Sequence, residues 1–463
     1  MKPAAILDIG SSKVVCLSGS VLDKGGIVIH GAGVSGCDGY LEDRFLDRQS
    51  LRDAIVDAVN KAEQEAHSRI RDIALTVPAS FSKLVLSDMT LTLGEHARVV
   101  DPTDIDRLID LSFRKIETPS GHVLMHSTPV FFLVDGISSA ELPQGIVTEE
   151  ISGLIAHMFV REDYIQAIQD ALDVFGIEIS MCVSASLAEA TMLIPEEERV
   201  RPAVLIDVGY RQTDICVIEN AALTGIASIP MGGYQFASDL AFGLDVTLQS
   251  AEQAKRRFVF SLDYGDKTEI LRSETASKRV ENSTIAYIIE ARANDLAQHI
   301  REELDRLQVN LESRPIVYLS GGGLLMMRGS LEFLKKALGF PIKRDMPWTP
   351  RLSSPNYCSA FGALNFVLRA NRIDDRPTQE KQEDKKFLQK VLFVRLLLFR
   401  PILGAVCAKD EVERAERAAV VGRGQPRRPR HVPLDRKAQS LFEKVERSSH
   451  HQKPAACQIH DRA

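Results

Sequence analysis

Two short segments that lie 199 positions apart share one pattern. Residues 4–10 read AAILDIG and residues 203–209 read AVLIDVG, so each has four apolar residues, then Asp, an aliphatic residue and Gly. Each continues through a polar turn into a second apolar run, which predicts a strand–turn–strand hairpin. Self-similarity at this separation indicates two related half-molecules. Because strands and helices alternate along residues 1–370, the predicted fold class is a layered α/β protein whose two halves face each other.

Length and composition narrow the possible classes of protein. A chain of 463 residues exceeds a single hydrophobic core, so more than one domain is expected. A net charge of -6 argues against a dedicated nucleic-acid-binding protein, although residues 408–463 are basic, with 13 Lys and Arg against 8 Asp and Glu. The seven cysteines include no Cys-x-x-Cys pair, which is typical of reduced cytosolic thiols. No run of 18 uncharged apolar residues occurs, so no transmembrane span is expected.

The repeated pattern suits a site for magnesium and phosphate. Asp8 and Asp207, at the two strand ends, can hold a hydrated Mg²⁺ ion. Gly10 and Gly209 follow two residues later and allow the backbone to approach a phosphate closely. One such turn alone is common at strand ends, whereas two matched copies favour a nucleotide site.

The two turns carry different side chains. Residues 11–13 read SSK, and their N–H groups and hydroxyls can cradle a phosphate while Lys13 adds positive charge. Residues 210–212 read YRQ, where a phosphate-binding turn usually has glycine or a small hydroxyl residue. These bulky residues predict a poorly seated terminal phosphate and weak hydrolysis. The other interpretation is that Arg211 itself supplies a phosphate contact.

Three further motifs follow along the chain. Residues 318–329, YLSGGGLLMMRG, place three glycines between a strand and a helix whose free N–H groups can face a ligand. Residues 229–236 contain a Gly-Gly turn, and residues 250–257, SAEQAKRR, place Glu and Lys three positions apart on a helix. Alone, these motifs are equally typical of tight turns and a solvated helix face. The late position and spacing of the glycines disfavour a Rossmann dinucleotide fold.

Taken together and in this order, these motifs resemble the actin and heat-shock ATPase superfamily. Within it the chain is similar to the FtsA family of bacterial cell-division proteins, because residues 126–136 and 151–168, HSTPVFFLVDG and ISGLIAHMFVREDYIQAI, are similar to the small α+β subdomain of that family. The resemblance covers roughly residues 4–370. It implies an actin-like ATPase fold with two related halves around a nucleotide cleft, and ATP with Mg²⁺ as ligands.

The resemblance also implies a role for each matching residue. The metal would be held by Asp8 and Asp207. The full set of expected nucleotide-binding residues is Asp8, Gly10, Ser11, Ser12 and Lys13 in the first phosphate loop, Asp207, Gly209, Thr213 and Asp214 in the second, Gly232 and Gly233 in the Gly-Gly turn, Glu252 and Lys255 beside the adenine and ribose, and Gly321, Gly322 and Gly323 around the adenosine.

The same resemblance implies a division of the chain into subdomains. The expected boundaries are 1–80 for subdomain 1A (completed by 163–200 and 355–372), 81–162 for the insert subdomain 1C, 201–235 for 2A (completed by 310–354), 236–309 for 2B, 373–384 for a linker, 385–406 for a membrane-associating segment and 407–463 for a disordered basic tail.

Residues 384–406 read DKKFLQKVLFVRLLLFRPILGAV and have the profile of an interfacial amphipathic helix. The predicted membrane contacts are the basic Lys386 and Lys390 and the apolar Phe387, Leu388, Val391 and Leu392. Basic residues beside an apolar face favour anionic lipid. A core helix is the alternative interpretation.

The resemblance implies a scaffold that polymerises on the cytoplasmic face of the inner membrane at the division site. It implies tethering of the tubulin-like protein FtsZ, and recruitment of later division proteins through the insert. Glu290 and Arg292 match family positions that help receive the C-terminal peptide of FtsZ, although an ordinary Glu/Arg helix face has the same pattern. The alternatives are a PilM-like protein of type IV pilus assembly and a sugar-kinase-type phosphotransferase on the same fold.

Overall fold

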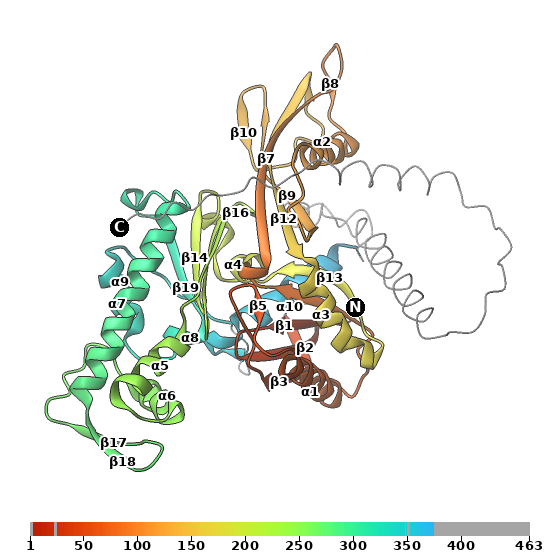
Figure 1. Ribbon diagram of the computed structural model, residues 1–463. Helices are drawn as coiled ribbons and strands as arrows, with labels where there is room; N and C mark the ends of the chain where they lie inside the picture. Colours follow the sequence, from red (N-terminus) through yellow and green to blue (C-terminus); the bar gives the residue numbers. More distant parts are fainter. Residues whose placement is uncertain (1–2, 23–25, 348, 350–351, 375–463) are drawn as a thin grey trace, which may run out of the picture. The chain divides into compact units, whose positions relative to one another are not determined.

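The structure is a computed structural model that describes residues 3–22, 26–347, 349 and 352–374 (Figure 1). The described residues all belong to one unit, Met1–Phe399. The predicted membrane segment, the basic tail and the predicted linker from residue 375 onward lie outside the described residues. Among the described residues, no helix is long and apolar enough to cross a membrane.

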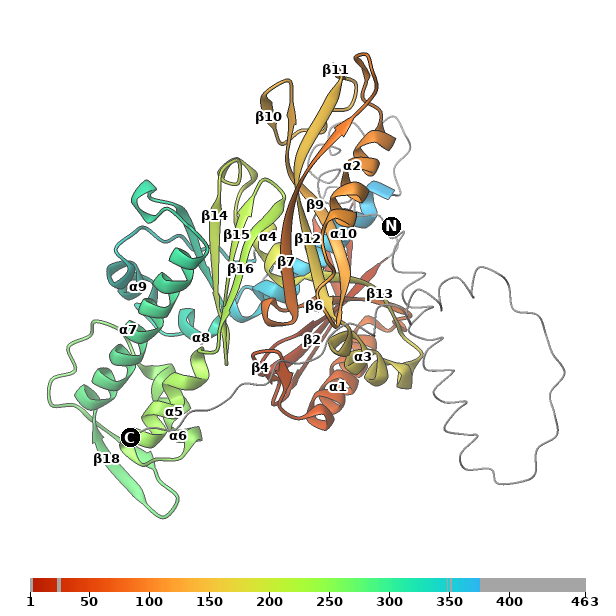
Figure 2. The same cartoon turned by 45° about the horizontal axis from the view of Figure 1, so that its top comes forward.

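The first half is built on a five-stranded sheet in the order β13-β6-β1-β2-β3. Its strands are β1 (Ala4–Ile9), β2 (Lys13–Val21), β3 (Ile27–Gly36), β6 (Asp72–Val77) and β13 (Glu178–Ser184). Alternate residues of β1 point to opposite faces. Leu7 and Ile9 pack in the core that includes α1 (Arg48–Ala66) and α3 (Glu162–Leu172), while Ile6 packs with α10 (Cys358–Asp374). Helices therefore cover both faces of this sheet (Figures 1 and 2).

The second half repeats this arrangement with a four-stranded sheet in the order β16-β15-β14-β19. Its strands are β14 (Ala203–Val208), β15 (Thr213–Glu219), β16 (Ala222–Ile229) and β19 (Ile316–Ser320). The core on one face is completed by residues of α5 (Gly233–Leu244), α6 (Leu248–Arg257), α7 (Asn282–Arg306) and α9 (Ser330–Leu338). A hairpin of β17 (Thr268–Arg272) and β18 (Ser277–Glu281) lies beyond α6 and α7 (Figure 1). The helix α4 (Ala185–Leu193) contacts both α10 and β15.

A separate four-stranded sheet occupies the chain between the first half's β6 and α3. It has the order β10-β9-β12-β7, with β7 (Ser82–Thr92), β9 (His122–Val134), β10 (Ile137–Ser139) and β12 (Glu150–Arg161). The helix α2 (Pro102–Lys115) packs on one face, and the short pair β8 (Arg98–Val99) and β11 (Val147–Thr148) lies at its end (Figure 2). Asp101 begins α2 with a capping box, which satisfies two free N–H groups of the first turn.

The sequence predicts three elements that differ in the structure. The glycines in residues 25–36 predict short strands separated by turns, but the structure has one strand, β3, whose glycines accommodate α1: a Cβ on Gly33 would lie 1.8 Å from the carbonyl oxygen of Ala58. Residues 250–262 predict one helix, but α6 ends at Arg257, and beyond it the Phe260 N–H donates to the carbonyl oxygen of Arg328. Residues after Gly339 predict a short strand, but the structure has a single bridge there, between Tyr318 and Lys343.

Candidate functional site

The two repeated hairpins have the same backbone pairing, as their sequences predict. Asp8 pairs with Val15 across β1 and β2, and Asp207 pairs with Asp214 across β14 and β15, seven positions along in both cases. The turns also match. The Gly10 N–H donates to the carbonyl oxygen three residues on over 2.9 Å, and the equivalent bond closes the second turn over 2.9 Å. The local fold of one hairpin is therefore repeated in the other.

Both turns line a cavity of about 950 Å³. It contains most of the residues predicted from the sequence: Asp8, Gly10, Ser11, Ser12, Lys13, Asp207, Gly209, Asp214, Glu252, Lys255, Gly321, Gly322 and Gly323. Tyr210, Arg211 and Gln212 line it as well. A volume of this size lies within the range of small-molecule sites, which is about 300–1,000 Å³.

Three predicted residues, Thr213, Gly232 and Gly233, are not in the cavity lining. Thr213 is buried and donates to the carbonyl oxygen of Met231 over 2.8 Å. A Cβ on Gly232 would lie 2.6 Å from the carbonyl oxygen of Gly209, and one on Gly233 would lie 2.8 Å from the Cα of residue 323. These glycines therefore allow the turns at 209–210, 232–233 and 321–323 to pack closely against one another beside the cavity.

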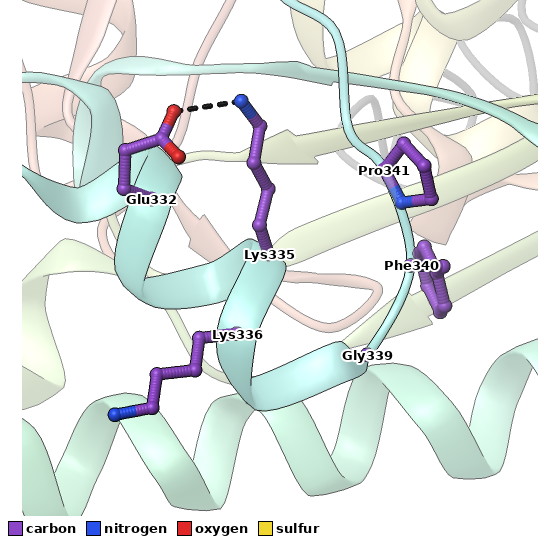
Figure 3. A pocket seen from close by; sticks show the side chains of 6 residues that line it. All are labelled: Glu332, Lys335, Lys336, Gly339, Phe340 and Pro341. Atoms are coloured by element: carbon purple, nitrogen blue, oxygen red, sulfur yellow. Dashed lines mark hydrogen bonds and ion pairs between the residues drawn. The ribbon is translucent and has the colours of Figure 1, made fainter.

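A second, separate hollow lies at the end of α9 and is lined by Glu332, Lys335, Lys336, Gly339, Phe340 and Pro341 (Figure 3). Lys335 forms an ion pair with Glu332 over 2.7 Å. None of the residues predicted to bind nucleotide, metal or partner lies in this lining.

The first hairpin presents one half-buried acid, Asp8, and one half-buried amine, Lys13. The hydroxyls of Thr76 and Ser359 each donate to Asp8 Oδ1 over 2.8 Å. Burial raises the pKa of Asp8, and these two hydrogen bonds oppose that shift. Lys13 Nζ donates to the carbonyl oxygen of Asn356 over 2.7 Å. Burial lowers the pKa of Lys13 to about 8, although the charges of Asp8 and Asp207 oppose the shift.

Further carboxyls lie on the second hairpin and on α4. Burial, followed by the charges of Asp214 and Asp8, raises the pKa of Asp207 to about 7. The sequence motifs did not identify Glu189, which lies on α4, is 2% exposed and also lines the cavity. Its Oε1 accepts a hydrogen bond from the Ser320 hydroxyl over 2.5 Å. Its signal in the sequence is that it is the single charged residue of α4. The cavity lining therefore brings together one buried acid, Glu189, and three half-buried ones, Asp8, Asp207 and Asp214.

The turn at 210–212 reaches across to the first half. The Arg211 N–H donates to Ser11 Oγ over 3.0 Å, and Gln212 Nε2 donates to Ser80 Oγ over 3.2 Å. The Arg211 guanidinium lies 4.4 Å from the ring centroid of Tyr234, which lies on α5. The large side chains of this turn are thus held by specific contacts that the sequence alone did not predict.

The sequence and the fold have known relatives. The family model "Cell division protein FtsA" matches residues 204–362. The FtsA protein of Pseudomonas aeruginosa is 24% identical over 373 residues, which is 78% of this chain and 88% of the relative. FtsA of Neisseria meningitidis is 25% identical and covers 79% of this chain and 90% of the relative.

The chain is similar to FtsA proteins over about three quarters of its length. Among solved structures, the PilM–PilN type IV pilus biogenesis complex contains a chain that matches with a TM-score of 0.55 and 18% identity, over 79% of this chain and 98% of that chain. A likeness at this identity shows the fold alone, and it confirms the predicted actin-like class. The resemblance to FtsA predicted from the motifs is likewise confirmed.

The cavity has features that fit a charged nucleotide and a cation. Three buried polar atoms in its lining, Arg211 Nε, Gln212 Oε1 and Asn356 Oδ1, have no hydrogen-bond partner within the described part of the chain. Buried polar groups normally have partners, so unpaired donors and acceptors in one cavity indicate a polar ligand. Within the described ranges, no three His, Cys, Asp or Glu residues form a ready metal cluster. An ion at Asp8 and Asp207 would therefore complete its shell with phosphate oxygens and water.

The residues that the FtsA resemblance assigns to the partner lie on α7, outside the cavity lining. Arg292 is 24% exposed and already contacts Asp239 over 2.5 Å and Asp295 over 2.6 Å. Glu290 is half-buried two positions earlier. The structure places this guanidinium between two carboxylates. A partner carboxylate would have to compete with these groups.

Proposed function

We propose that this protein is an actin-like, ATP-binding cell-division scaffold. The observation that carries the proposal is the pairing of two matched Asp-x-Gly hairpins in one cavity, in a chain related to FtsA over about three quarters of its length. In this proposal Asp8 and Asp207 hold Mg²⁺. The ion supplies neutralisation of phosphate charge when it is bound.

The chain's own residues supply the rest of the nucleotide site. The N–H groups and hydroxyls of residues 11 and 12 face the phosphates together with Lys13. Lys255 Nζ lies 2.6 Å from Glu252 Oε2 and donates to the carbonyl oxygen of Gly233 over 2.8 Å. This buried pair forms a rigid wall for the adenine and ribose, and the turn at 321–323 supplies the opposite wall.

The scaffold is proposed to polymerise on the cytoplasmic face of the inner membrane, to tether FtsZ and to recruit later division proteins. The insert supports an interaction role, because Val99 on β8, Ile137 on β10 and Val147 on β11 are each more than half exposed. A PilM-like role in pilus assembly is the second candidate, supported by the shared fold.

Liposome sedimentation with purified FtsZ tests this role. We expect the full chain to carry FtsZ into the pellet with anionic vesicles. Less FtsZ should sediment at high salt, because salt screens the attraction between the basic residues and the anionic lipid. A chain truncated after residue 384 is the matched control, which should bind ATP but remain in the supernatant. Sedimentation of the truncated chain would show that the anchor lies elsewhere. Failure of the full chain to bring FtsZ down would favour the PilM-like role.

The partner site is tested separately with a labelled C-terminal peptide of FtsZ. Arg292→Glu should weaken peptide binding in fluorescence anisotropy by about tenfold. The change removes the two N–H donors of the guanidinium that can bind a peptide carboxylate, and it adds a negative charge that repels that carboxylate. Arg306→Glu is the control, since Arg306 lies on the same helix and is 67% exposed. Equal peptide affinity in both variants would place the partner site elsewhere.

A further inference from the structure

Arg211 lies where the two phosphate loops meet. Because the two hairpins have the same register, Arg211 is the counterpart of Ser12. It directly precedes Gln212, whose carbonyl oxygen accepts the hydrogen bond that closes the turn. Its backbone N–H donates to Ser11 Oγ over 3.0 Å, so its main chain touches the opposite loop. A ligand group that reaches both loops must therefore pass beside this residue.

The guanidinium of Arg211 is held by aromatic faces and not by an acid. It lies 4.4 Å from the ring centroid of Tyr234 and 5.8 Å from that of Tyr210. No ion pair is found for Arg211 within the described ranges, and its buried Nε has no hydrogen-bond partner there. Arginine is weakly hydrated and stacks readily on aromatic rings, so this arrangement holds the charge in place and leaves its donors available.

The other cations of the cavity are already engaged. Lys13 donates to the carbonyl oxygen of Asn356, and Lys255 contacts Glu252. Arg256 also pairs with Glu252 and is 71% exposed. Of these four cations, Arg211 is the one whose side chain has neither an ion pair nor a hydrogen bond within the described residues, so it can take a new anion without losing either.

The positive charge of Arg211 also acts on Cys37, a residue of the first half. Burial raises the pKa of the Cys37 thiol to about 11, and the positive charge of Arg211 is among the effects that oppose this shift. Cys37 also lines the cavity, and its N–H donates to the carbonyl oxygen of Ser12 over 3.1 Å. Arg211 therefore lies near the segment of the first half that contacts the first phosphate loop.

We propose that Arg211 binds the terminal phosphate of a nucleoside triphosphate and makes the cleft prefer ATP to ADP. The inference rests on the proposed function, because it assumes that ATP occupies this cavity. The diphosphate part is shared by both nucleotides and lies against groups that do not distinguish them. The third phosphate adds negative charge at the meeting point of the loops, where a guanidinium can donate two parallel hydrogen bonds.

Calorimetric titration of the full chain with ATP and with ADP, each with Mg²⁺, tests the inference. Arg211→Ala should weaken ATP binding by at least about tenfold, the size expected for a charged hydrogen bond, and ADP binding by less than about twofold. Arg211→Lys should give an intermediate loss, because lysine keeps the charge without the planar fork. Arg256→Ala is the matched control and should leave the ratio of ATP to ADP affinity unchanged.

The outcomes separate the inference from the function on which it rests. Equal weakening of ATP and ADP in Arg211→Ala, or no change in either, overturns the role of Arg211 while nucleotide binding itself stands. Binding of neither nucleotide by the unmodified protein overturns the proposed function. If Arg211→Ala loses its circular dichroism spectrum, Arg211→Lys decides, and an unchanged ratio of ATP to ADP affinity in that variant counts against the inference.

Discussion

The two hairpins of this molecule differ in their turns but not in their strands. Both have the same cross-strand pairing, the same closing hydrogen bond and an aspartate at the same position. The first turn, at 11–13, has two small hydroxyl residues and a lysine, whereas the second, at 210–212, has Tyr, Arg and Gln. Backbone pairing and burial fix the strands, and the turn side chains can diverge without altering them. The chemistry of each loop is therefore set by its turn.

The surroundings of the two turns are also different. One glycine covers the first turn: a Cβ on Gly39 would lie 2.3 Å from the carbonyl oxygen of Ser11. The second turn is covered by two glycine turns, and a Cβ on Gly323 would lie 1.9 Å from the carbonyl oxygen of Gly209. The second hairpin is therefore the more tightly enclosed.

The largest effect is expected from breaking that enclosure. Gly323→Ala should lower the free energy of unfolding by about 3 kcal/mol or more, because its Cβ overlaps two backbone oxygens of the second hairpin. Urea denaturation measures the change. Gly94→Ala is the control, since its Cβ would lie 3.7 Å from the nearest atom and should change stability by less than about 0.5 kcal/mol. Equal stability of the two variants would show that the second turn is not closely covered.

A smaller effect tests the extra acid of the second hairpin, where Asp214 stands in the place of Val15. Burial raises the pKa of Asp214 to about 6, so the folded protein binds a proton that the unfolded chain releases near pH 4. Stability from this group is therefore present at low pH and is lost as pH rises from about 4 to about 6. Asparagine at position 214 cannot titrate, so the Asp214→Asn variant does not lose this contribution as pH rises. Its free energy of unfolding minus that of the unmodified protein should therefore increase by about 2 kcal/mol between pH 4.5 and pH 7.

Urea denaturation of the nucleotide-free protein at the two pH values measures this difference. Asp88→Asn, at an exposed carboxylate of the insert, is the control and should show no such increase. A stability difference for Asp214→Asn that is constant with pH would contradict the raised pKa.

The smallest effect concerns turnover. Steady-state phosphate release by the unmodified protein should be far below the common enzyme range of about 1–10³ s⁻¹, because Tyr210 and Arg211 occupy the turn that positions the phosphate and water. Replacing residues 210–212 by Gly-Gly-Thr, the pattern of the resembling family, should raise the rate by about tenfold. A rate within that range for the unmodified protein would show that the bulky turn does not hinder hydrolysis.

The sequence predicted the strands and the cavity better than the contacts within the cavity. Periodic apolar runs and the Asp-x-Gly repeat are local signals, so the hairpins and most lining residues followed from them. Glu189 could not be placed, because its role depends on α4 lying beside Ser320 of the other half. The partner contacts of Arg292 depend on how α7 packs against α5, which no local pattern records. Interactions between distant segments therefore account for what sequence reasoning missed.

The central claim is that both hairpins hold one nucleotide with its metal ion. Calorimetric titration of Mg²⁺-ATP into the unmodified protein, Asp8→Ala and Asp207→Ala tests it most directly. We expect saturable binding to the unmodified protein and no measurable binding to either variant. Asp38→Ala, at an exposed acid in the same lining, should bind normally. Unchanged ATP affinity in Asp8→Ala and Asp207→Ala would contradict the claim.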